Sequence, residues 1–190
     1  MLPQVGNEIG HARSSRLLKA IDLSVNIPVF TATDNVVHKA RRGTAEWNDG
    51  TLDISPDGLH NYYYIPPVDG RVSFCIFPSE GLEKDCYVIS DQFGGCQYHT
   101  LYNENEKMFA FLHVFRERGN VVQYQMADGW RRLSIQHSSP LSRRKGTAGI
   151  GVWAISHIRR DETNPVANSC FMHLDNTARV TEIHDGAMAE

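Results

Sequence analysis

The chain has 190 residues, of which 41% are hydrophobic and 22% are charged, a composition typical of folded globular proteins. Its formal net charge of −3 and its pI near 6.3 argue against nucleic-acid binding driven by overall charge. No segment approaches the roughly 20 apolar residues of a membrane helix. The N-terminus lacks the basic region and apolar core of a classical signal peptide. We therefore expect one domain over residues 1–190, made in the cytoplasm and, if exported, delivered to a target cell by a specialised secretion system.

The first quarter of the chain predicts little regular structure. Residues 1–13 are polar and show no periodicity, so we expect a polar N-terminal arm ahead of a β-rich domain over residues 14–190. A serine pair followed by an apolar stripe predicts a short helix over 14–21. A second short helix is predicted over 34–42, because basic residues and then a glycine are typical of a helix C-terminus.

The rest of the chain alternates short β-forming segments with turn sequences. The segments are rich in β-branched and aromatic residues, as strands prefer. This pattern predicts a mostly β protein with a few short helices (α+β), built as a packed β-sandwich of antiparallel or mixed sheets. In chain order, the predicted strands are 25–33, 51–55, 60–65, 71–77, 86–90, 98–102, 108–115, 121–126, 130–137, 147–158, 169–174 and 178–183.

A hairpin in the middle of the chain carries the candidate chemistry. Gly94-Gly95 brings Cys96 to the start of one predicted strand, and a strongly apolar strand returns with His113 inside it. The polar segment 103–106 between the strands has a length common in hairpin loops.

The hairpin register predicts which side chains meet. If Tyr102 faces Lys107, Cys96 lies directly opposite His113, with Cβ atoms roughly 4.5–5.5 Å apart. His99 then points to the other face of the hairpin, because side chains alternate along a strand. A slip of one residue would separate the pair. This register predicts a contact between the thiol of Cys96 and the imidazole of His113.

A thiol beside an imidazole is the arrangement that nucleophilic catalysis needs. The Cys96 thiolate attacks a carbonyl or carboxamide carbon, and His113 takes the thiol proton and returns it to the leaving amine. Glycines before the cysteine let the backbone N–H groups of Gly95 and Cys96 approach the developing oxyanion. Gln92 and Gln97 flank this turn and are candidates for binding a substrate amide. The structural alternative is a buried cysteine and a core histidine.

The same residues resemble the glutamine deamidases of the cytotoxic necrotizing factor type, which include Burkholderia lethal factor and the chemoreceptor glutamine deamidase. The resemblance lies in Gly95-Cys96 followed 17 residues later by His113 in an apolar strand. Several members also have a threonine six residues before the cysteine, which orients the histidine. Here that residue is Ser90, which keeps the hydroxyl group and lacks the methyl group.

This resemblance implies a cysteine-dependent protein glutamine deamidase that converts Gln to Glu through a thioester. A bacterial toxin or effector acting on a protein of a host or target cell is the implied setting. The chemistry requires no metal and no organic cofactor, and neither nucleic acid nor membrane is an expected partner. Transglutamination and the cleavage of a peptide or ester use the same residues and stay open.

Two other functions compete with catalysis by Cys96. One is a non-catalytic β-sandwich module that binds proteins through the tyrosines at 62–64 and through the basic segments 131–132 and 143–145.

Within the catalytic hypothesis, His157 and His184 lie near predicted strand ends, and either would be an alternative base to His113.

The other competitor is a zinc site made by Cys96-x-x-His99 and Cys170-x-x-His173. Residues three apart in a strand face opposite ways, so this site requires a tight turn within each pair.

Overall fold

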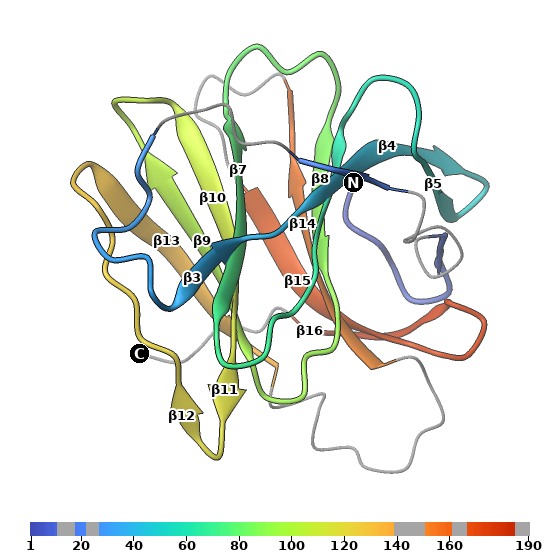
Figure 1. The fold of residues 1–190 in the computed structure, drawn as a ribbon. Coiled ribbons are helices and arrows are strands. Elements are labelled where there is room, and N and C mark those ends of the chain that lie inside the picture. The colour runs from blue at the N-terminus through green and yellow to red at the C-terminus, as the bar shows by residue number, and fades with distance from the viewer. Residues whose placement is uncertain (11–17, 22–26, 139–150, 161–166, 185–190) are drawn as a thin grey trace.

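The structure is a computed structural model that describes residues 1–10, 18–21, 27–138, 151–160 and 167–184. Within these ranges every regular element is a strand (Figure 1), so the prediction of a mostly β protein is confirmed. In chain order, the strands are β1 (Glu8–Ile9), β2 (Lys19–Ala20), β3 (Val36–His38), β4 (Arg41–Asn48), β5 (Thr51–Ser55), β6 (Tyr62–Ile65), β7 (Val72–Pro78), β8 (Cys86–Ser90), β9 (Gln97–Asn103), β10 (Met108–Val114), β11 (Arg116–Glu117), β12 (Asn120–Val121), β13 (Trp130–His137), β14 (Gly151–Ile158), β15 (Ala167–Leu174) and β16 (Val180–His184).

The two predicted helices are wrong wherever they can be compared with the structure. The segment 34–42 contains β3 and the start of β4. β3 pairs in parallel with β7, and this long-range pairing overrides the local helix signals. In the first predicted helix, Lys19–Ala20 forms β2 against β4, and residues 14–17 lie outside the described residues.

A nine-stranded sheet curls until its two ends meet. Its order is β1-β5-β4-β6-β8-β14-β15-β16, with β2 also paired to β4. The ends are joined by backbone hydrogen bonds from Gly6 N–H to Val180 O (2.8 Å), from Val180 N–H to Asn7 O (2.7 Å) and from Ile9 N–H to Ala178 O (2.9 Å). The sheet is therefore nearly barrel-shaped. Its interior holds a cluster of buried side chains that includes Ile9, Leu52, Ile89, Trp153 and Met172.

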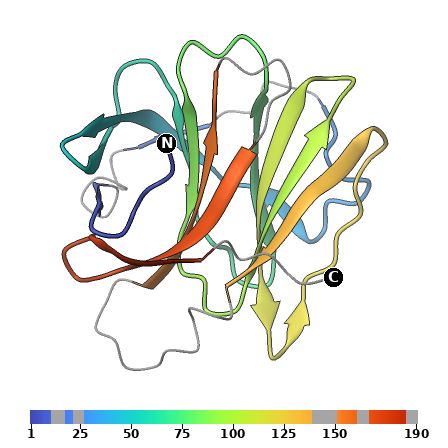
Figure 2. The ribbon, with the colours of Figure 1, turned by 180° about the vertical axis from the view of Figure 1, so that it is seen from behind.

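A five-stranded sheet, β13-β9-β10-β7-β3, packs against one side of the curled sheet (Figure 2). The cluster between the two sheets takes Val88 and Phe171 from the curled sheet, and Tyr98 and Phe111 from the five-stranded sheet. The candidate hairpin consists of β9 and β10, so one of its faces looks into this interior.

The opposite face of the five-stranded sheet is covered by two irregular segments. Phe30 and Met126 form a single bridge between them, and Phe30 packs with Phe74 and Leu112. The strand predicted at 25–33 is therefore wrong over residues 27–33, and residues 25–26 lie outside the described residues. The strand predicted at 121–126 is confirmed only at Val121. Pro28 cannot donate a backbone hydrogen bond, which disfavours a longer pairing here.

The described part of the predicted N-terminal arm, residues 1–10, joins the curled sheet rather than standing apart from it, and residues 11–13 lie outside the described residues. Glu8–Ile9 pairs in parallel with Thr51–Ser55, and Ile9 is fully buried. Among the described residues, no helix has the length and apolarity needed to cross a membrane.

This arrangement predicts a large effect of truncating Ile9. We expect Ile9→Ala to lower the free energy of unfolding by about 2–5 kcal/mol, because it removes buried methyl groups from the interior of the curled sheet. Val5→Ala is the matched control, since Val5 is 64% exposed and its truncation should change stability by less than about 0.5 kcal/mol. Urea denaturation measures both. Equal, small effects would mean that residues 1–9 are an unattached arm.

Candidate functional site

The turn between β8 and β9 presents Cys96. Gly95 has φ = +131°, a backbone conformation that glycine adopts without strain. The N–H of Gly95 donates a hydrogen bond to Ser138 Oγ (3.2 Å), and the hydroxyl of Ser138 donates to Cys96 O (3.1 Å). Cys96 follows this turn, is 6% exposed and belongs to the cluster between the sheets.

The predicted register of the hairpin is wrong by two residues. His113 pairs with Tyr98, and Met108 pairs with Asn103, so the loop is 104–107 rather than 103–106. The side chain of Asn103 explains the difference, because its Oδ1 accepts hydrogen bonds from the N–H groups of residues 105 and 106, both 3.1 Å long. Asn103 thus ends the strand and caps the turn.

A register shift of two residues leaves Cys96 and His113 on the same face of the hairpin, but they are no longer directly opposite each other. Cys96 comes two residues before Tyr98, the partner of His113, so extended alternation turns both side chains toward the same interior. Diagonal neighbours of this kind are roughly 7–8 Å apart. The two residues are therefore adjacent on one face instead of directly opposed.

Ser90 and His113 meet across the interior. Ser90 is the last residue of β8 in the curled sheet, and its Oγ lies 2.9 Å from His113 Nδ1 on β10. The same Oγ lies 2.6 Å from the carbonyl oxygen of Ile65. A hydroxyl group has one proton to donate, and the Ile65 carbonyl can only accept. Ser90 must therefore donate to Ile65 and accept from His113, which puts the imidazole proton on Nδ1.

The other ring nitrogen of His113 is left as an acceptor. Nε2 is buried and has no hydrogen-bond partner among the described residues, Cys96 Sγ included. The ring of Phe93 stacks on the imidazole with a centroid separation of 4.1 Å. A neutral imidazole with a free Nε2 lone pair is a competent proton acceptor.

Burial keeps both members of the candidate pair uncharged. His113 is fully buried, and desolvation lowers its pKa from 6.5 to about 3. Desolvation also raises the pKa of the Cys96 thiol, an effect opposed by hydrogen bonds from the N–H of Arg116 and from its own N–H. The structure therefore holds a neutral thiol and a neutral imidazole.

The other three cysteines lie in still less favourable surroundings for a thiolate. All four are free. Burial raises the pKa of Cys86 and Cys170 to about 12 and raises that of Cys75 further. Cys96 is the most exposed of the four, and backbone N–H groups point at its sulfur.

The predicted oxyanion and amide-binding groups are arranged differently from expectation. The N–H of Gly95 is already bonded to Ser138. Gln92 is exposed on the turn, with φ = +59°, and its side chain bonds to Asp91. Gln97, the other candidate for binding a substrate amide, points away from Cys96: strand alternation turns it to the other face, where its Oε1 lies 2.8 Å from His99 Nε2.

The four residues of the alternative zinc site do not converge. Cys96 lies between the two sheets, whereas Cys170 lies inside the curled sheet. His99 binds Tyr124 and Gln97. Nowhere in the described ranges do three or more potential ligands gather as a metal site would require.

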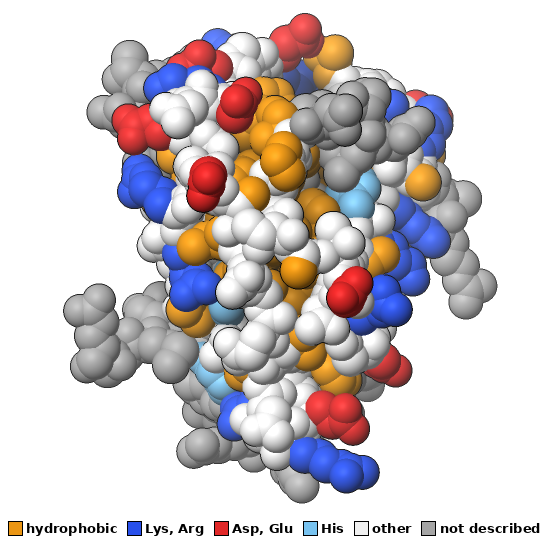
Figure 3. Space-filling view, turned by 60° about the vertical axis from the view of Figure 1, so that its left-hand side comes forward, with side chains coloured by type: hydrophobic (Ala, Val, Ile, Leu, Met, Phe, Trp, Pro, Cys, Tyr) orange, Lys and Arg blue, Asp and Glu red, His pale blue; other side chains and the backbone are white. Residues whose placement is uncertain are grey.

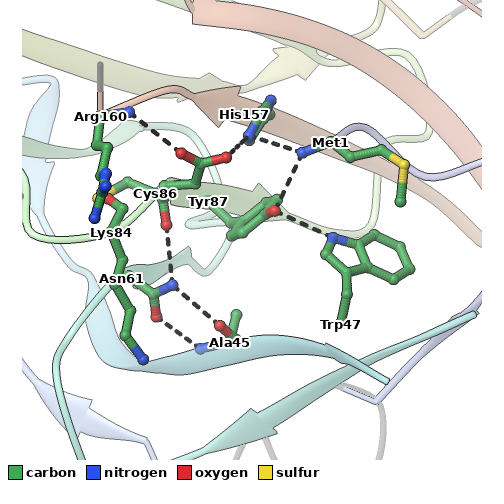
Figure 4. Close-up of polar contacts among 10 residues, drawn as sticks. Met1, Ala45, Trp47, Asn61, Lys84, Cys86, Tyr87, His157 and Arg160 are labelled. Atoms are coloured by element: carbon green, nitrogen blue, oxygen red, sulfur yellow. Dashed lines mark hydrogen bonds and ion pairs between the residues drawn. The ribbon is translucent and has the colours of Figure 1, made fainter. Parts of the chain in front are cut away.

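His157, an alternative base, belongs to a different polar cluster (Figure 4). Its Nε2 lies 2.8 Å from Asp85 Oδ2 and 2.8 Å from the amino group of Met1. The hydroxyl of Tyr87 accepts a hydrogen bond from Trp47 Nε1 (3.1 Å). These contacts engage His157 away from the turn that carries Cys96. His184, the other alternative base, ends the outer strand β16.

Two residues at the site have no local signal in the sequence. Ser138 reads as the start of a polar loop, yet it contacts Gly95 and Cys96 more than 40 residues earlier. Phe93 reads as a turn residue, yet it is 2% exposed and covers the imidazole of His113. Both contacts depend on long-range pairing.

Comparison with known proteins found no significantly similar protein. No family model matches the chain, and neither a curated protein nor a solved structure is significantly similar to it. The deamidase likeness therefore depends on the residues of the site themselves.

The hydrogen-bond geometry predicts the tautomer of His113. In ¹⁵N NMR spectra of the imidazole at pH 7, we expect the proton on Nδ1 and none on Nε2. With a folded-state pKa of about 3, the ring should stay neutral down to about pH 4. Ser90→Ala removes the acceptor and should release this preference, whereas Ser90→Thr keeps it. A proton on Nε2 in the wild-type protein would contradict the assignment.

Proposed function

We propose that the chain is a cysteine-dependent protein glutamine deamidase, a toxin or effector that converts Gln to Glu on a protein of a target cell. One observation carries the proposal. The bond between Ser90 Oγ and His113 Nδ1 fixes an imidazole whose Nε2, unpaired among the described residues, lies on the face that Cys96 enters. Ser90 orients the base, His113 is the general acid and base, and Cys96 is the nucleophile.

The reaction follows from these roles. The thiol proton of Cys96 passes to His113 Nε2, and the sulfur bonds to the carboxamide carbon while the carbonyl electron pair moves to oxygen. The pair then returns, the C–N bond breaks, and Nε2–H protonates the nitrogen, which leaves as ammonia. Water next attacks the thioester, giving its proton to Nε2. The C–S bond breaks, the product is glutamate, and the thiol is regenerated.

The fixed orientation of the imidazole lets one nitrogen, Nε2, both accept and return the proton in these steps. Before attack, Nε2 accepts a proton, and after attack it donates the same proton, while Nδ1 keeps its proton throughout. Ser90 accepts from Nδ1–H in both states and therefore stabilises the imidazolium as it forms. Ile65 contributes only by holding the hydroxyl of Ser90 in the accepting orientation.

The closed interior sets a condition for catalysis. His113 is fully buried and Cys96 nearly so, and the two are diagonal neighbours rather than a bonded pair. A substrate glutamine must therefore displace the packing around Cys96 before the thiol reaches Nε2. Induced closure and opening of this kind are common gating steps in enzymes.

The proposal includes three further expectations. The first is a packed β-sandwich. It is supported by two sheets that face each other across the site, of which the larger one curls. The steps above need no metal and no organic cofactor. Transglutamination replaces the attacking water by an amine, and hydrolysis of a peptide or ester replaces the leaving ammonia.

The binding-module alternative loses most of the tyrosine surface predicted for it. Tyr62 is fully buried and Tyr64 is 8% exposed, because β6 lies between β4 and β8. Tyr63 is half-buried and stacks on Phe77, so the tyrosine strand is largely core. Arg131 and Arg132 lie over the rings of Tyr102 and Tyr124, and residues 143–145 lie outside the described residues. On the face in Figure 3, basic and acidic side chains are interspersed. The described residues on this face therefore show no patch of a single charge sign that would favour an acidic partner.

The proposed activity predicts a change in target-cell proteins. We expect the wild-type protein, added to a lysate in H₂¹⁸O, to convert particular glutamines to ¹⁸O-labelled glutamate, as measured by mass spectrometry. Cys96→Ala and His113→Ala should each reduce this conversion by about 10³-fold or more, because each removes an essential group. Ser90→Ala should reduce it, and Ser90→Thr should retain it.

Cys75→Ala is the matched control, because it removes a buried thiol outside the proposed chemistry. Its activity should equal that of the wild type once folding is verified by circular dichroism. Identical conversion by the wild type and Cys96→Ala, or no conversion in proteins from any target cell, would refute the proposal.

A further inference from the structure

Ser138 joins two distant parts of the chain at the candidate nucleophile. It directly follows β13, whose last residue, His137, pairs with Gln97 of β9. Ser138 is fully buried, and its single hydroxyl accepts from Gly95 N–H (3.2 Å) and donates to Cys96 O (3.1 Å). One side chain therefore hydrogen-bonds both to the N–H of the residue before the nucleophile and to the carbonyl oxygen of the nucleophile itself.

This arrangement conflicts with the chemistry expected of the turn. An oxyanion hole needs N–H groups that point at the developing negative charge and have no other acceptor. Here the Gly95 N–H is committed to Ser138, and the Cys96 N–H lies against its own sulfur. In this conformation neither predicted donor is free.

The same contact also helps to keep the thiol covered. The two hydrogen bonds to Ser138 hold the Gly95 N–H and the Cys96 carbonyl in place, and these groups flank the peptide bond between Gly95 and Cys96. With the backbone held there, Cys96 stays in the cluster with Phe93, where it is 6% exposed. Gly95 has no Cβ, and an added Cβ would meet no atom of the described residues within 4 Å. Around Gly95, the contacts that the described residues make with the turn are therefore hydrogen bonds, including the one to Ser138, rather than packing.

We propose that Ser138 is a latch on the nucleophile turn: its hydroxyl holds Cys96 in the covered state, and its release frees the Gly95 N–H. The role of that freed N–H as an oxyanion donor depends on the proposed function. The latch itself does not, because it concerns only the turn and the exposure of the thiol.

The latch predicts local loosening when the hydroxyl is removed. In Ser138→Ala, we expect hydrogen exchange of the Gly95 amide and alkylation of Cys96 by iodoacetamide to accelerate by at least about three- to tenfold, because both hydrogen bonds of the hydroxyl are lost. Alkylation of Cys75 should not change, since it is fully buried elsewhere in the interior. NMR measures the exchange, and peptide mass spectrometry measures the labelling of each cysteine.

Two further variants make the test specific. Ser138→Thr retains the hydroxyl and should keep the slow exchange and slow alkylation of the wild type. Ser134→Ala removes a serine from the adjoining strand β13; it is the control for losing a nearby serine hydroxyl and should change neither rate. Unchanged exchange at Gly95 in Ser138→Ala would overturn the latch. Equal acceleration at Cys75 would also overturn it, by showing global destabilisation.

These readouts need no substrate, so they separate the latch from the proposed activity. A protein that shows the expected exchange but never deamidates retains the latch and loses the deamidase proposal. A protein that deamidates, but whose Gly95 amide exchanges at the same rate in Ser138→Ala as in the wild type, retains the deamidase proposal and loses the latch.

Discussion

The hydrogen bond between Ser90 and His113 is the constraint on which the site depends. An imidazole buried between two sheets cannot be hydrated, so its polar atoms must find partners within the protein or stay unpaired at a cost. Nδ1 is paired with a hydroxyl whose own proton is committed to Ile65, and Nε2 has no partner in the part of the chain that the structure describes. Stability alone would favour pairing both nitrogens. An oriented histidine with one free lone pair is what proton transfer requires.

The burial that orients His113 also suppresses its reactivity. Desolvation lowers the pKa of the imidazole and raises that of the Cys96 thiol, so the two groups stay neutral while the interior is dry. Ser138 and Phe93 maintain this state from opposite ends of the turn, one by hydrogen bonds and the other by packing. A thiol covered in this way is protected from adventitious oxidation and alkylation, and under the proposed function it becomes reactive when a substrate loosens the turn.

The sequence predicts the parts of this site that depend on local pattern and misses those that depend on distant pairing. Alternation and turn residues place β8, β9, β10 and β13 nearly at their observed bounds, and they put Cys96 and His113 on one face. The register is missed because Asn103 caps the turn with its side chain, which shifts the loop by one residue at each end. The strand β3 is missed because it pairs with β7 over more than 30 residues. Ser138 is missed because nothing near it in the chain indicates the turn it binds.

The most direct test of the account is the distance between Cys96 Sγ and His113 Nε2 when a carboxamide occupies the site. A crystal structure of the protein alkylated at Cys96 by 2-chloroacetamide provides it. We predict that Nε2 approaches the sulfur or the attached carboxamide within about 4 Å, that Ser90 still accepts from Nδ1, and that the Gly95 N–H has left Ser138. An adduct that turns to solvent while His113 stays stacked under Phe93 with Nε2 unpaired would contradict the pairing of these two residues in catalysis.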